Sequence, residues 1–223
     1  MTSAPEIKFY YAPGACSLAP HILLHEVGAE YRPMPFEIGA QGTNITEEFA
    51  AVNPKLKVPT LSLSSLGSVA EIITESPAVC TVIAGLAPEK NFMGEEGIER
   101  VRVLEWFNYL SGTLHGGAFG HLFRPERFTI DSSEEALEAV RTKAKENITT
   151  CFKYVEGRLR EGKWAVGEGF TGVDAFLLVF WRWGSAYGFG MERYGKYQKL
   201  MGRLVERKSV KEVLKLEGIK AML

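Results

Sequence analysis

The sequence predicts an α/β domain followed by an all-helical domain. Short apolar runs alternate with helical apolar spacing over residues 1–86, whereas no strand pattern follows the Pro-containing segment at 87–95. Charge differs as well, because residues 1–86 hold four Lys/Arg and eight Asp/Glu, a net of -4, and residues 87–223 hold 22 and 19, a net of +3. We therefore expect domains at 1–86 and 96–223, joined by a linker at 87–95.

The first domain has the predicted order β-α-β-α-β-β-α. Apolar runs indicate strands at residues 7–11, 31–36, 59–63 and 69–71, the last two separated by Gly67, and helical spacing indicates helices at 17–27, 46–51 and 76–86. Gly28 is expected to end the first helix. Pro33 and Pro35 cannot donate to a ladder, so the second strand belongs at an edge. A parallel start and an antiparallel finish predict a mixed four-stranded sheet covered by helices.

The second domain contains only helical patterns, at residues 98–114, 134–160, 173–187, 192–205 and 210–216. The 173–187 segment is very apolar and carries few charges, so it is expected to be buried on all sides. Thr171 and Asp174 stand three residues apart before it, which is the spacing of a capping box.

Composition excludes several classes of protein. A net charge of -1 argues against nucleic acid as the main partner. No apolar run approaches ~20 residues, so no membrane span is expected, and the first residues lack the pattern of a signal peptide. Three cysteines are too few for a disulfide framework, and this favours a reducing compartment such as the cytoplasm.

Cys16 is the leading candidate for chemistry, because it follows a strand and a Pro-Gly turn at the start of a predicted helix. Unpaired N–H groups and the helix dipole favour a thiolate there, so we expect a lowered pKa. A thioredoxin-like redox site would carry a second cysteine where Ala19 stands, so Cys16 has no internal disulfide partner in this motif. Cys80 and Cys151 lie inside helical patterns and are interpreted as core residues.

Two further motifs could hold a peptide-like zwitterion. Val58 precedes Pro59, and a cis proline would leave the Val58 backbone open to pair with a ligand, although the dipeptide also suits a plain strand start. Ser76 is a good N-cap for the helix that follows, whose N-terminus could bind a carboxylate, and Glu75 could accept a hydrogen bond from an ammonium group. The other interpretation is simply a well-capped helix.

The long helix of the second half adds Asn108, Thr113 and His115. Seven residues separate Asn108 from His115, which predicts that both lie on one helix face, and His115 could hydrogen-bond a thiolate or act as a general base. His21 and His25 have metal-ligand spacing, but no third ligand is evident, so no metal site is expected.

These motifs together resemble the glutathione transferase superfamily, and most closely its bacterial beta class with a cysteine in the active site. The first motif that carries the resemblance runs from Phe9 to His21 (FYYAPGACSLAPH). The others are NPK at 53–55, VPTL at 58–61, TES at 74–76, WFNY at 106–109, LH at 114–115, GFTGVDA at 169–175 and RW at 182–183. The likeness covers nearly the whole chain.

The resemblance implies a thioredoxin-like domain, a helical domain, a homodimer, and glutathione as cosubstrate. It implies that Cys16 faces the glutathione sulfur, that Val58 pairs with the cysteinyl backbone and Pro59 is cis, and that Glu75 and Ser76 hold the γ-glutamyl end. It also implies that Ala15 and Ser17 flank Cys16, that Asn108 and His115 approach the thiol from the helical domain, and that Trp183 lines a hydrophobic acceptor pocket. We add Thr113 from the same helix, and Phe119 and Phe123 at that pocket.

The sequence departs from that class at three places. No lysine follows the second strand, Gly116 replaces a lysine after His115, and Lys57 stands where a glutamine is usual and could compensate for the missing cations. Four glycines between residues 112 and 120 are expected to loosen the helix there.

Three functions stay open at this point. The first is conjugation of glutathione to a hydrophobic electrophile. The second is thiol exchange, reductive cleavage or isomerisation through Cys16. The third is a non-enzymatic binding protein that uses the same fold.

Overall fold

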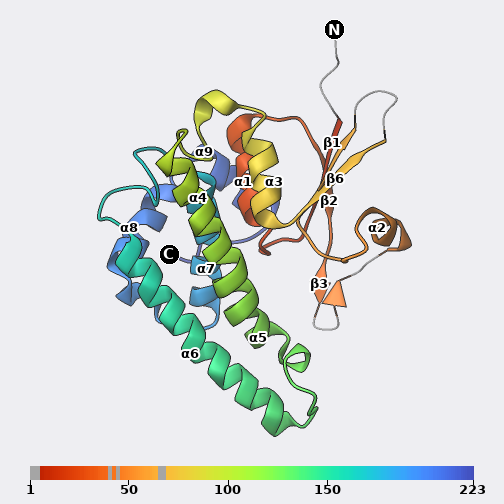
Figure 1. The fold of residues 1–223 in the computed structure, drawn as a ribbon, viewed down its shortest axis with the longest axis vertical. Coiled ribbons are helices and arrows are strands. Elements are labelled where there is room, and N and C mark those ends of the chain that lie inside the picture. Colours follow the sequence, from red (N-terminus) through yellow and green to blue (C-terminus); the bar gives the residue numbers. More distant parts are fainter. Residues whose placement is uncertain (1–5, 40–41, 44–45, 65–68) are drawn as a thin grey trace.

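The computed structural model describes residues 6–39, 42–43, 46–64 and 69–223 (Figure 1). The predicted turn at Gly67 lies outside these residues. The chain begins with a small α/β unit and continues as a bundle of helices, as the sequence predicts.

The main sheet has four strands in the order β2-β1-β5-β6. They are β1 (Glu6–Tyr11), β2 (Arg32–Pro35), β5 (Thr60–Ser64) and β6 (Glu71–Thr74). β1 pairs parallel with β2 and antiparallel with β5, and β5 pairs antiparallel with β6, so the predicted mixed sheet with β2 at an edge is confirmed. The strand predicted at 69–71 is wrong in its bounds: Val69 is 92% exposed and the ladder starts at Glu71. The short pair β3 (Ile38–Gly39) and β4 (Gly42–Thr43) was not predicted.

Three helices flank the sheet: α1 (Leu18–Val27), α2 (Glu47–Val52) and α3 (Ser76–Ala84). Gly28 ends α1 in the left-handed conformation with φ 75°, as predicted. Thr46 caps α2 by accepting a 3.2 Å hydrogen bond from the Phe49 N–H. In Figure 1, α1 and α3 lie on the side of the sheet that faces the helical bundle, and α2 lies on the other side.

The helical part contains α4 (Ile98–Asn108), α5 (Gly120–Phe123), α6 (Glu134–Arg158), α7 (Gly172–Ala186), α8 (Gly195–Leu204) and α9 (Lys208–Leu216). Short 3₁₀ turns occur at Pro88–Lys90, Pro125–Arg127 and Met191–Arg193. The helix predicted over 98–114 does not end there. It continues as a π-helix over Tyr109–Phe119, the stretch that contains most of the glycines expected to loosen it.

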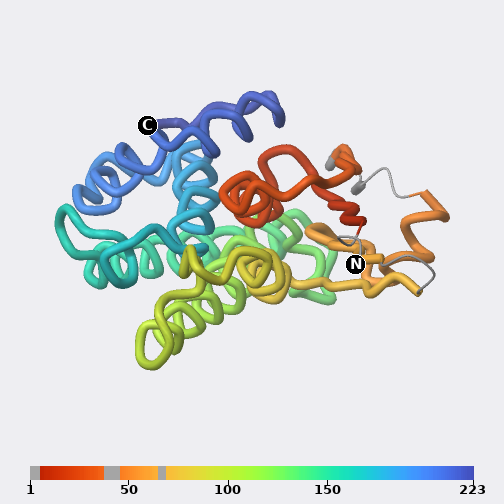
Figure 2. Tube along the Cα trace, turned by 90° about the horizontal axis from the view of Figure 1, so that it is seen from above, coloured from red at the N-terminus to blue at the C-terminus, as the bar shows by residue number. Residues whose placement is uncertain are grey.

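α7 is the centre of the bundle, and twelve of its fifteen residues are buried, as its composition predicts. It packs against α1, which also contacts α9, so helices from both halves of the chain meet at α1 (Figure 2). One continuous hydrophobic core joins them. The N-terminal end of α1, where Cys16 stands, therefore lies at the boundary between the α/β part and the helical part.

Candidate active site

Cys16 lies in the turn between β1 and α1, two residues before the first residue of α1. Its side chain is buried, and its Sγ donates a 3.3 Å hydrogen bond to the Val58 carbonyl oxygen. The Ser76 hydroxyl, at the start of α3, is also within hydrogen-bonding reach of the thiol. The fold therefore brings together three predicted site residues from three separate segments of the chain.

The prediction of a lowered Cys16 pKa is wrong for this structure. Burial raises the pKa of the Cys16 thiol to about 11, and the Glu75 carboxylate adds to that rise. The Ser76 hydroxyl and the backbone N–H groups of Cys16 and Ser17 act in the opposite direction, so the helix N-terminus has its expected effect. Desolvation outweighs it, because the thiol has little contact with water.

Ser17 is completely buried and its hydroxyl is used within the turn. Its Oγ accepts a 3.1 Å hydrogen bond from the Ala12 N–H and donates one of 3.1 Å to the Ala12 carbonyl. The Ser17 hydroxyl therefore stabilises the turn that presents Cys16, and the expectation that Ser17 contacts a ligand stays a prediction. Ala15 lies in the same turn, where its N–H donates to the Ala12 carbonyl over 3.0 Å.

The Val58–Pro59 peptide bond is cis, as the resemblance implies. The segment before it is held by Asn53, whose side-chain amide donates to the Lys57 carbonyl over 2.8 Å and to Thr60 Oγ1 over 2.9 Å. The Lys57 side chain is exposed, and Val58 is half-buried. Asn53 was recognised only as part of a motif, and the structure gives it a positioning role.

Glu75 takes the N-cap position of α3 with φ 72°, a left-handed conformation that is uncommon for a glutamate. Ser76 is thus the first helical residue, where the predicted helix begins, and the N-cap is Glu75 and not Ser76. The Glu75 carboxylate forms an ion pair with the Lys55 ammonium group, which also donates to Thr74 Oγ1 over 2.5 Å. No local sequence pattern predicts this pair, because twenty positions separate its members.

His115 brings the helical part to the same place. Its ring is half-buried and lies 5.1 Å from the Trp183 ring, centroid to centroid. Burial lowers the pKa of His115 to about 4, the positive charge of Lys57 lowers it further, and Glu75 acts in the opposite direction. His115 is therefore neutral at pH 7 and lies within electrostatic range of the residues around Cys16.

Asn108 and Thr113 are both exposed, and Asn108 donates to the Leu104 carbonyl of its own helix over 2.9 Å. The prediction that Asn108 and His115 share a face assumed α-helical spacing. The π-helix begins at Tyr109 and holds more residues per turn, so seven residues no longer complete two turns.

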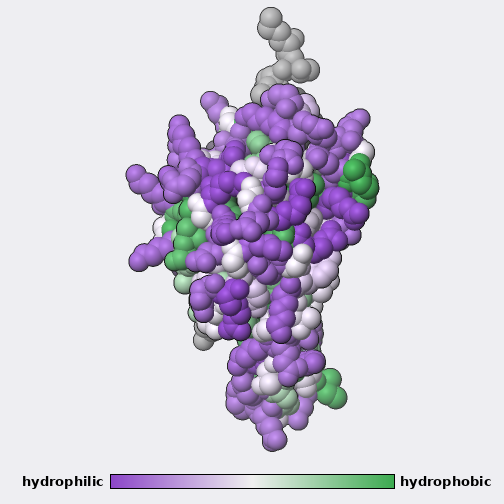
Figure 3. Space-filling view, turned by 90° about the vertical axis from the view of Figure 1, so that its left-hand side faces the viewer, coloured by the Kyte–Doolittle hydropathy of each residue, from purple (hydrophilic) through white to green (hydrophobic). Residues whose placement is uncertain are grey.

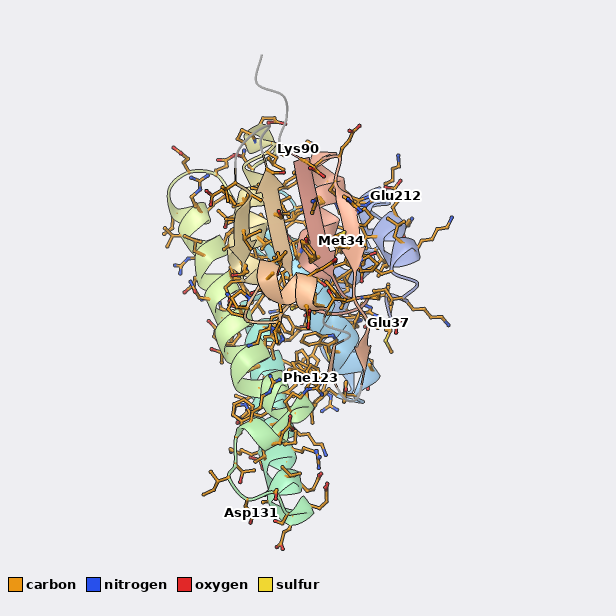
Figure 4. The ribbon with its side chains drawn as sticks, turned by 90° about the vertical axis from the view of Figure 1, so that its right-hand side faces the viewer. Met34, Glu37, Lys90, Phe123, Asp131 and Glu212 are labelled. Carbon is orange, nitrogen blue, oxygen red and sulfur yellow. The ribbon has the colours of Figure 1, made fainter. Side chains whose placement is uncertain are left out.

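The predicted aromatic residues form one cluster beside the turn. Trp183 donates from Nε1 to the Gly14 carbonyl over 2.9 Å, which joins α7 directly to the Cys16 turn. Phe123 lies 5.1 Å and Phe119 5.2 Å from the Trp183 ring, centroid to centroid. Phe123 is half-buried, and Figure 4 places it beyond the lower end of the sheet. Phe119 is fully buried and so forms the inner part of the cluster.

Comparison with known proteins identifies the family. Residues 5–85 match the model of the glutathione S-transferase N-terminal domain, and residues 115–208 match that of the C-terminal domain. The chain is 33% identical to glutathione S-transferase GstA of Escherichia coli O157:H7 over 215 residues, which cover 96% of this chain and 100% of the relative. The chain belongs to the glutathione S-transferase family.

Two solved glutathione S-transferases share the fold over almost their full length. A sphingomonad enzyme complexed with glutathione is 31% identical, with a TM-score of 0.76 over 96% of this chain and 100% of that one. A bacterial beta-class enzyme of Sphingomonas chungbukensis is 30% identical, with a TM-score of 0.77 and the same coverage. The thioredoxin-like and all-helical architecture of the transferase is therefore confirmed, whereas the domain limits at 86 and 96 stay predictions.

Sequence reasoning missed the contacts that hold Gly14 in this transferase. The Gly14 N–H donates to Glu217 over 2.8 Å, and Arg182 approaches the Gly14 carbonyl at 3.5 Å. Glu217 also binds Nδ1 of His21 at 2.7 Å, and both side chains are almost completely buried. These contacts span about two hundred residues of sequence, so no motif spacing could have predicted them.

The lowered pKa of His115 predicts how stability depends on pH. Between pH 6.5 and about 4 the unfolded chain binds a proton at His115 that the folded protein does not, so stability falls as the pH falls through this window. His115→Gln, which cannot take up that proton, should lose less stability between pH 7 and 4.5 in urea unfolding. An equal loss in the variant and the wild type would contradict the assignment.

Proposed function

We propose that this transferase binds glutathione beside Cys16 and presents its thiol to a hydrophobic electrophile. The observation that carries the proposal is the convergence of the Cys16 thiol, the Val58 carbonyl and the Ser76 hydroxyl at the boundary between the two parts of the fold. Three polar groups of this kind match the thiol, the backbone and the glutamyl end of a short peptide. The relatives' glutathione complex supports the same choice of ligand.

Each end of glutathione has candidate partners. Val58 would pair with the cysteinyl backbone, since its own backbone lies beside the Cys16 thiol, with the carbonyl oxygen 3.3 Å from Sγ. Ser76 and the N-terminus of α3 would accept the γ-glutamyl carboxylate, and Glu75 its ammonium group. Lys57 supplies positive charge nearby, which favours an anionic ligand, whereas the charge of Lys55 is balanced by Glu75.

The raised pKa of Cys16 gives the thiol a specific role in conjugation. At pH 7 Cys16 keeps its hydrogen, so it can donate to a glutathione thiolate and does not repel it as a second anion. Neutral His115 can accept the proton that the glutathione thiol releases. Lowering the pKa of the glutathione thiol from about 9 to about 7 needs roughly 2–3 kcal/mol of stabilisation of its thiolate, which two charge-assisted hydrogen bonds can supply.

The acceptor pocket is proposed at the aromatic cluster. Trp183 and Phe123 are partly exposed beside the Cys16 turn, with Phe119 behind them. Ring faces and edges of this kind bind flat apolar compounds, so an aromatic electrophile fits best.

A second candidate reaction uses Cys16 directly. Its thiol donates to the Val58 carbonyl, next to the place proposed for the glutathione sulfur. With a glutathione mixed disulfide as substrate, the Cys16 sulfur would attack the glutathione sulfur and release the substrate thiol, and a second glutathione would then attack this Cys16–glutathione disulfide, releasing oxidised glutathione and restoring the Cys16 thiol. This would support thiol exchange or reductive cleavage in place of conjugation. Replacing Cys16 separates the two reactions.

Glutathione titration tests the proposal. Calorimetry with millimolar glutathione should show binding, and an aromatic electrophile should be turned over by the same preparation. Ser76→Ala should weaken binding about tenfold to a hundredfold, because it removes one hydrogen bond to a charged group. Ser132→Ala, at an exposed loop position, is the matched control and should leave binding unchanged. The absence of both binding and turnover in the wild type would refute the proposal.

We also propose a homodimer in the reducing cytoplasm. The described cysteines are free, which suits that compartment.

Exposed apolar side chains lie along α4 at Ile98, Val101 and Leu104, and Ile72 adds another on the edge strand β6. Larger hydrophobic patches of this kind are typical of subunit contacts. Figure 3 shows the side that lies on the left in Figure 1, and this face is mostly hydrophilic with separate hydrophobic patches. Within the described residues no helix is long and apolar enough to cross a bilayer. Light scattering should give twice the chain mass.

A further inference from the structure

Five polar side chains form a hydrogen-bonded chain that runs from buried Glu217, the residue that binds the Gly14 N–H, to Glu212 on the surface of α9. Glu217 Oε1 lies 2.7 Å from His21 Nδ1, and His21 Nε2 lies 2.6 Å from the Tyr31 hydroxyl. The same hydroxyl lies 3.1 Å from His25 Nε2, and His25 Nδ1 lies 3.3 Å from Glu212 Oε2. His21 and His25 come from consecutive turns of α1, which explains why one tyrosine can reach both.

One end of this hydrogen-bonded chain is buried, and the other end is exposed to solvent. The side chains of His21 and Glu217 are 1% and 0% exposed, whereas those of His25 and Glu212 are 19% and 46% exposed. Figure 4 shows Glu212 on α9 at the surface of the molecule. Among the residues that the structure describes, the Tyr31 hydroxyl is the hydrogen-bonding group that joins His21 to His25.

The inner end is attached to the proposed active site. The second oxygen of Glu217 accepts the 2.8 Å hydrogen bond from Gly14, which stands two residues before Cys16. A change in how His21 holds Glu217 is therefore passed to the turn that presents the thiol.

Counting hydrogens gives the protonation state of the chain. Both carboxylates can only accept, so Nδ1 of His21 and Nδ1 of His25 must each carry a hydrogen. Tyr31 has one hydrogen and faces two ring nitrogens, so it donates to one of them and accepts from the other. All contacts are satisfied only when one of the two imidazoles carries a second hydrogen.

We propose that Tyr31 relays this one shared proton between His25, which reaches solvent, and His21, which does not. In one direction the Nε2 hydrogen of His25 passes to the Tyr31 oxygen while the Tyr31 hydrogen passes to His21 Nε2. The reverse step restores the first state. The tyrosine is a neutral phenol before and after, and no other bond changes.

The surroundings of the chain fit this exchange. Burial raises the pKa of Tyr31 to about 12, so the phenol keeps its hydrogen at neutral pH. Two residues face the inner end. The Tyr11 ring lies 4.6 Å from that of His21, centroid to centroid, and the Arg182 guanidinium interacts electrostatically with Glu217. The groups that face the outer end are Glu26, Arg207 and Lys208, the last of which pairs with Glu212 at 3.6 Å.

For catalysis the relay makes Tyr31 a positioning residue, and this consequence rests on the proposed function. With the proton on His21, an imidazolium faces Glu217 and strengthens that pair; with the proton on His25, Glu217 is held by a neutral ring. Solvent pH thereby reaches the Gly14 contact although the contact itself is buried.

Nitrogen NMR of the histidine rings in the full-length ¹⁵N-labelled protein tests the relay. The sequence has only four histidines, so their ring signals can be assigned. In the wild type the Nε2 shifts of His21 and His25 should change together over one pH range, as expected for a coupled pair. Tyr31→Phe keeps the ring and removes the hydroxyl, and should abolish the response of His21 to titration of His25.

The controls separate the relay from other effects. Tyr154→Phe on α6 removes an exposed hydroxyl and should leave both signals unchanged. If Tyr31→Phe does not fold, His25→Gln removes the outer proton site and should likewise stop His21 from responding. An unchanged His21 titration in either folded variant overturns the proposal.

Glutathione binding is measured on the same samples. Tyr31→Phe should raise the KM for glutathione about threefold to tenfold with a smaller change in kcat, the loss expected for one hydrogen bond acting through a second residue. If the wild type binds no glutathione, the proposed function fails while the NMR result still decides the relay. If glutathione binds and the ring signals are uncoupled, the relay alone fails.

Discussion

Replacing Asp174 with alanine should lower the free energy of unfolding by about 3–5 kcal/mol. Asp174 is completely buried in the first turn of α7. Its carboxylate accepts hydrogen bonds from the Thr171 N–H at 2.8 Å, the Thr171 hydroxyl at 3.1 Å and the Ala165 N–H at 2.9 Å. Alanine would leave these donors buried without partners and would remove the capping box.

The effect should extend to the whole protein, because α7 packs against α1 and α4. Asp131→Ala is the matched control: Asp131 also accepts a backbone hydrogen bond, 2.8 Å from the Ser133 N–H, but it lies exposed at the far end of the molecule (Figure 4). Its loss should cost less than about 1 kcal/mol. Urea unfolding followed by tryptophan fluorescence measures both variants, and a loss below about 1 kcal/mol for Asp174→Ala would contradict the role given to the capping box.

Replacing Cys16 with serine should abolish glutathione-dependent thiol exchange, with a loss of more than about 100-fold, because serine cannot form a mixed disulfide. Conjugation should survive with a smaller loss, since a serine hydroxyl can still donate to a glutathione thiolate and His115 is retained. Both rates are measured on one preparation, with an aromatic electrophile for conjugation and a mixed disulfide for exchange.

Cys151→Ser is the control, because Cys151 lies in α6 and belongs to the helical core. It should change neither rate by more than about twofold if the variant folds. Thiol exchange that persists in Cys16→Ser would eliminate the covalent reaction, and conjugation lost as completely as exchange would place Cys16 at the centre of both reactions.

The sequence predicts the order of the four main-sheet strands and the long helices because that order depends on local apolar spacing, but it does not predict the short β3–β4 pair. It predicts the buried character of α7 and the edge position of β2 for the same reason, since charge depletion and paired prolines are visible in a short window. The π-helix at Tyr109–Phe119 could not be predicted in this way. Its apolar residues fit an α-helix equally well, and the difference lies in hydrogen bonding.

The sequence proposes the site residues as a set, but it does not predict the pKa shifts of Cys16 and His115. The sign of the Cys16 pKa shift depends on how much water the thiol loses, and this is decided by Val58, Ser76 and the core behind them, which are distant in sequence. The inward orientation of the Ser17 hydroxyl depends on the tight turn after β1. Glu217 was missed because only the folded chain brings it to Gly14.

The central claim is that glutathione binds with its sulfur beside Cys16, and a crystal structure of the protein soaked in millimolar glutathione tests it most directly. We predict that the sulfur lies within about 4 Å of Cys16 Sγ, with the cysteinyl backbone on Val58 and the γ-glutamyl carboxylate at Ser76. Glutathione bound with its sulfur away from Cys16, or a site at Cys16 that stays empty in such crystals, would contradict the claim.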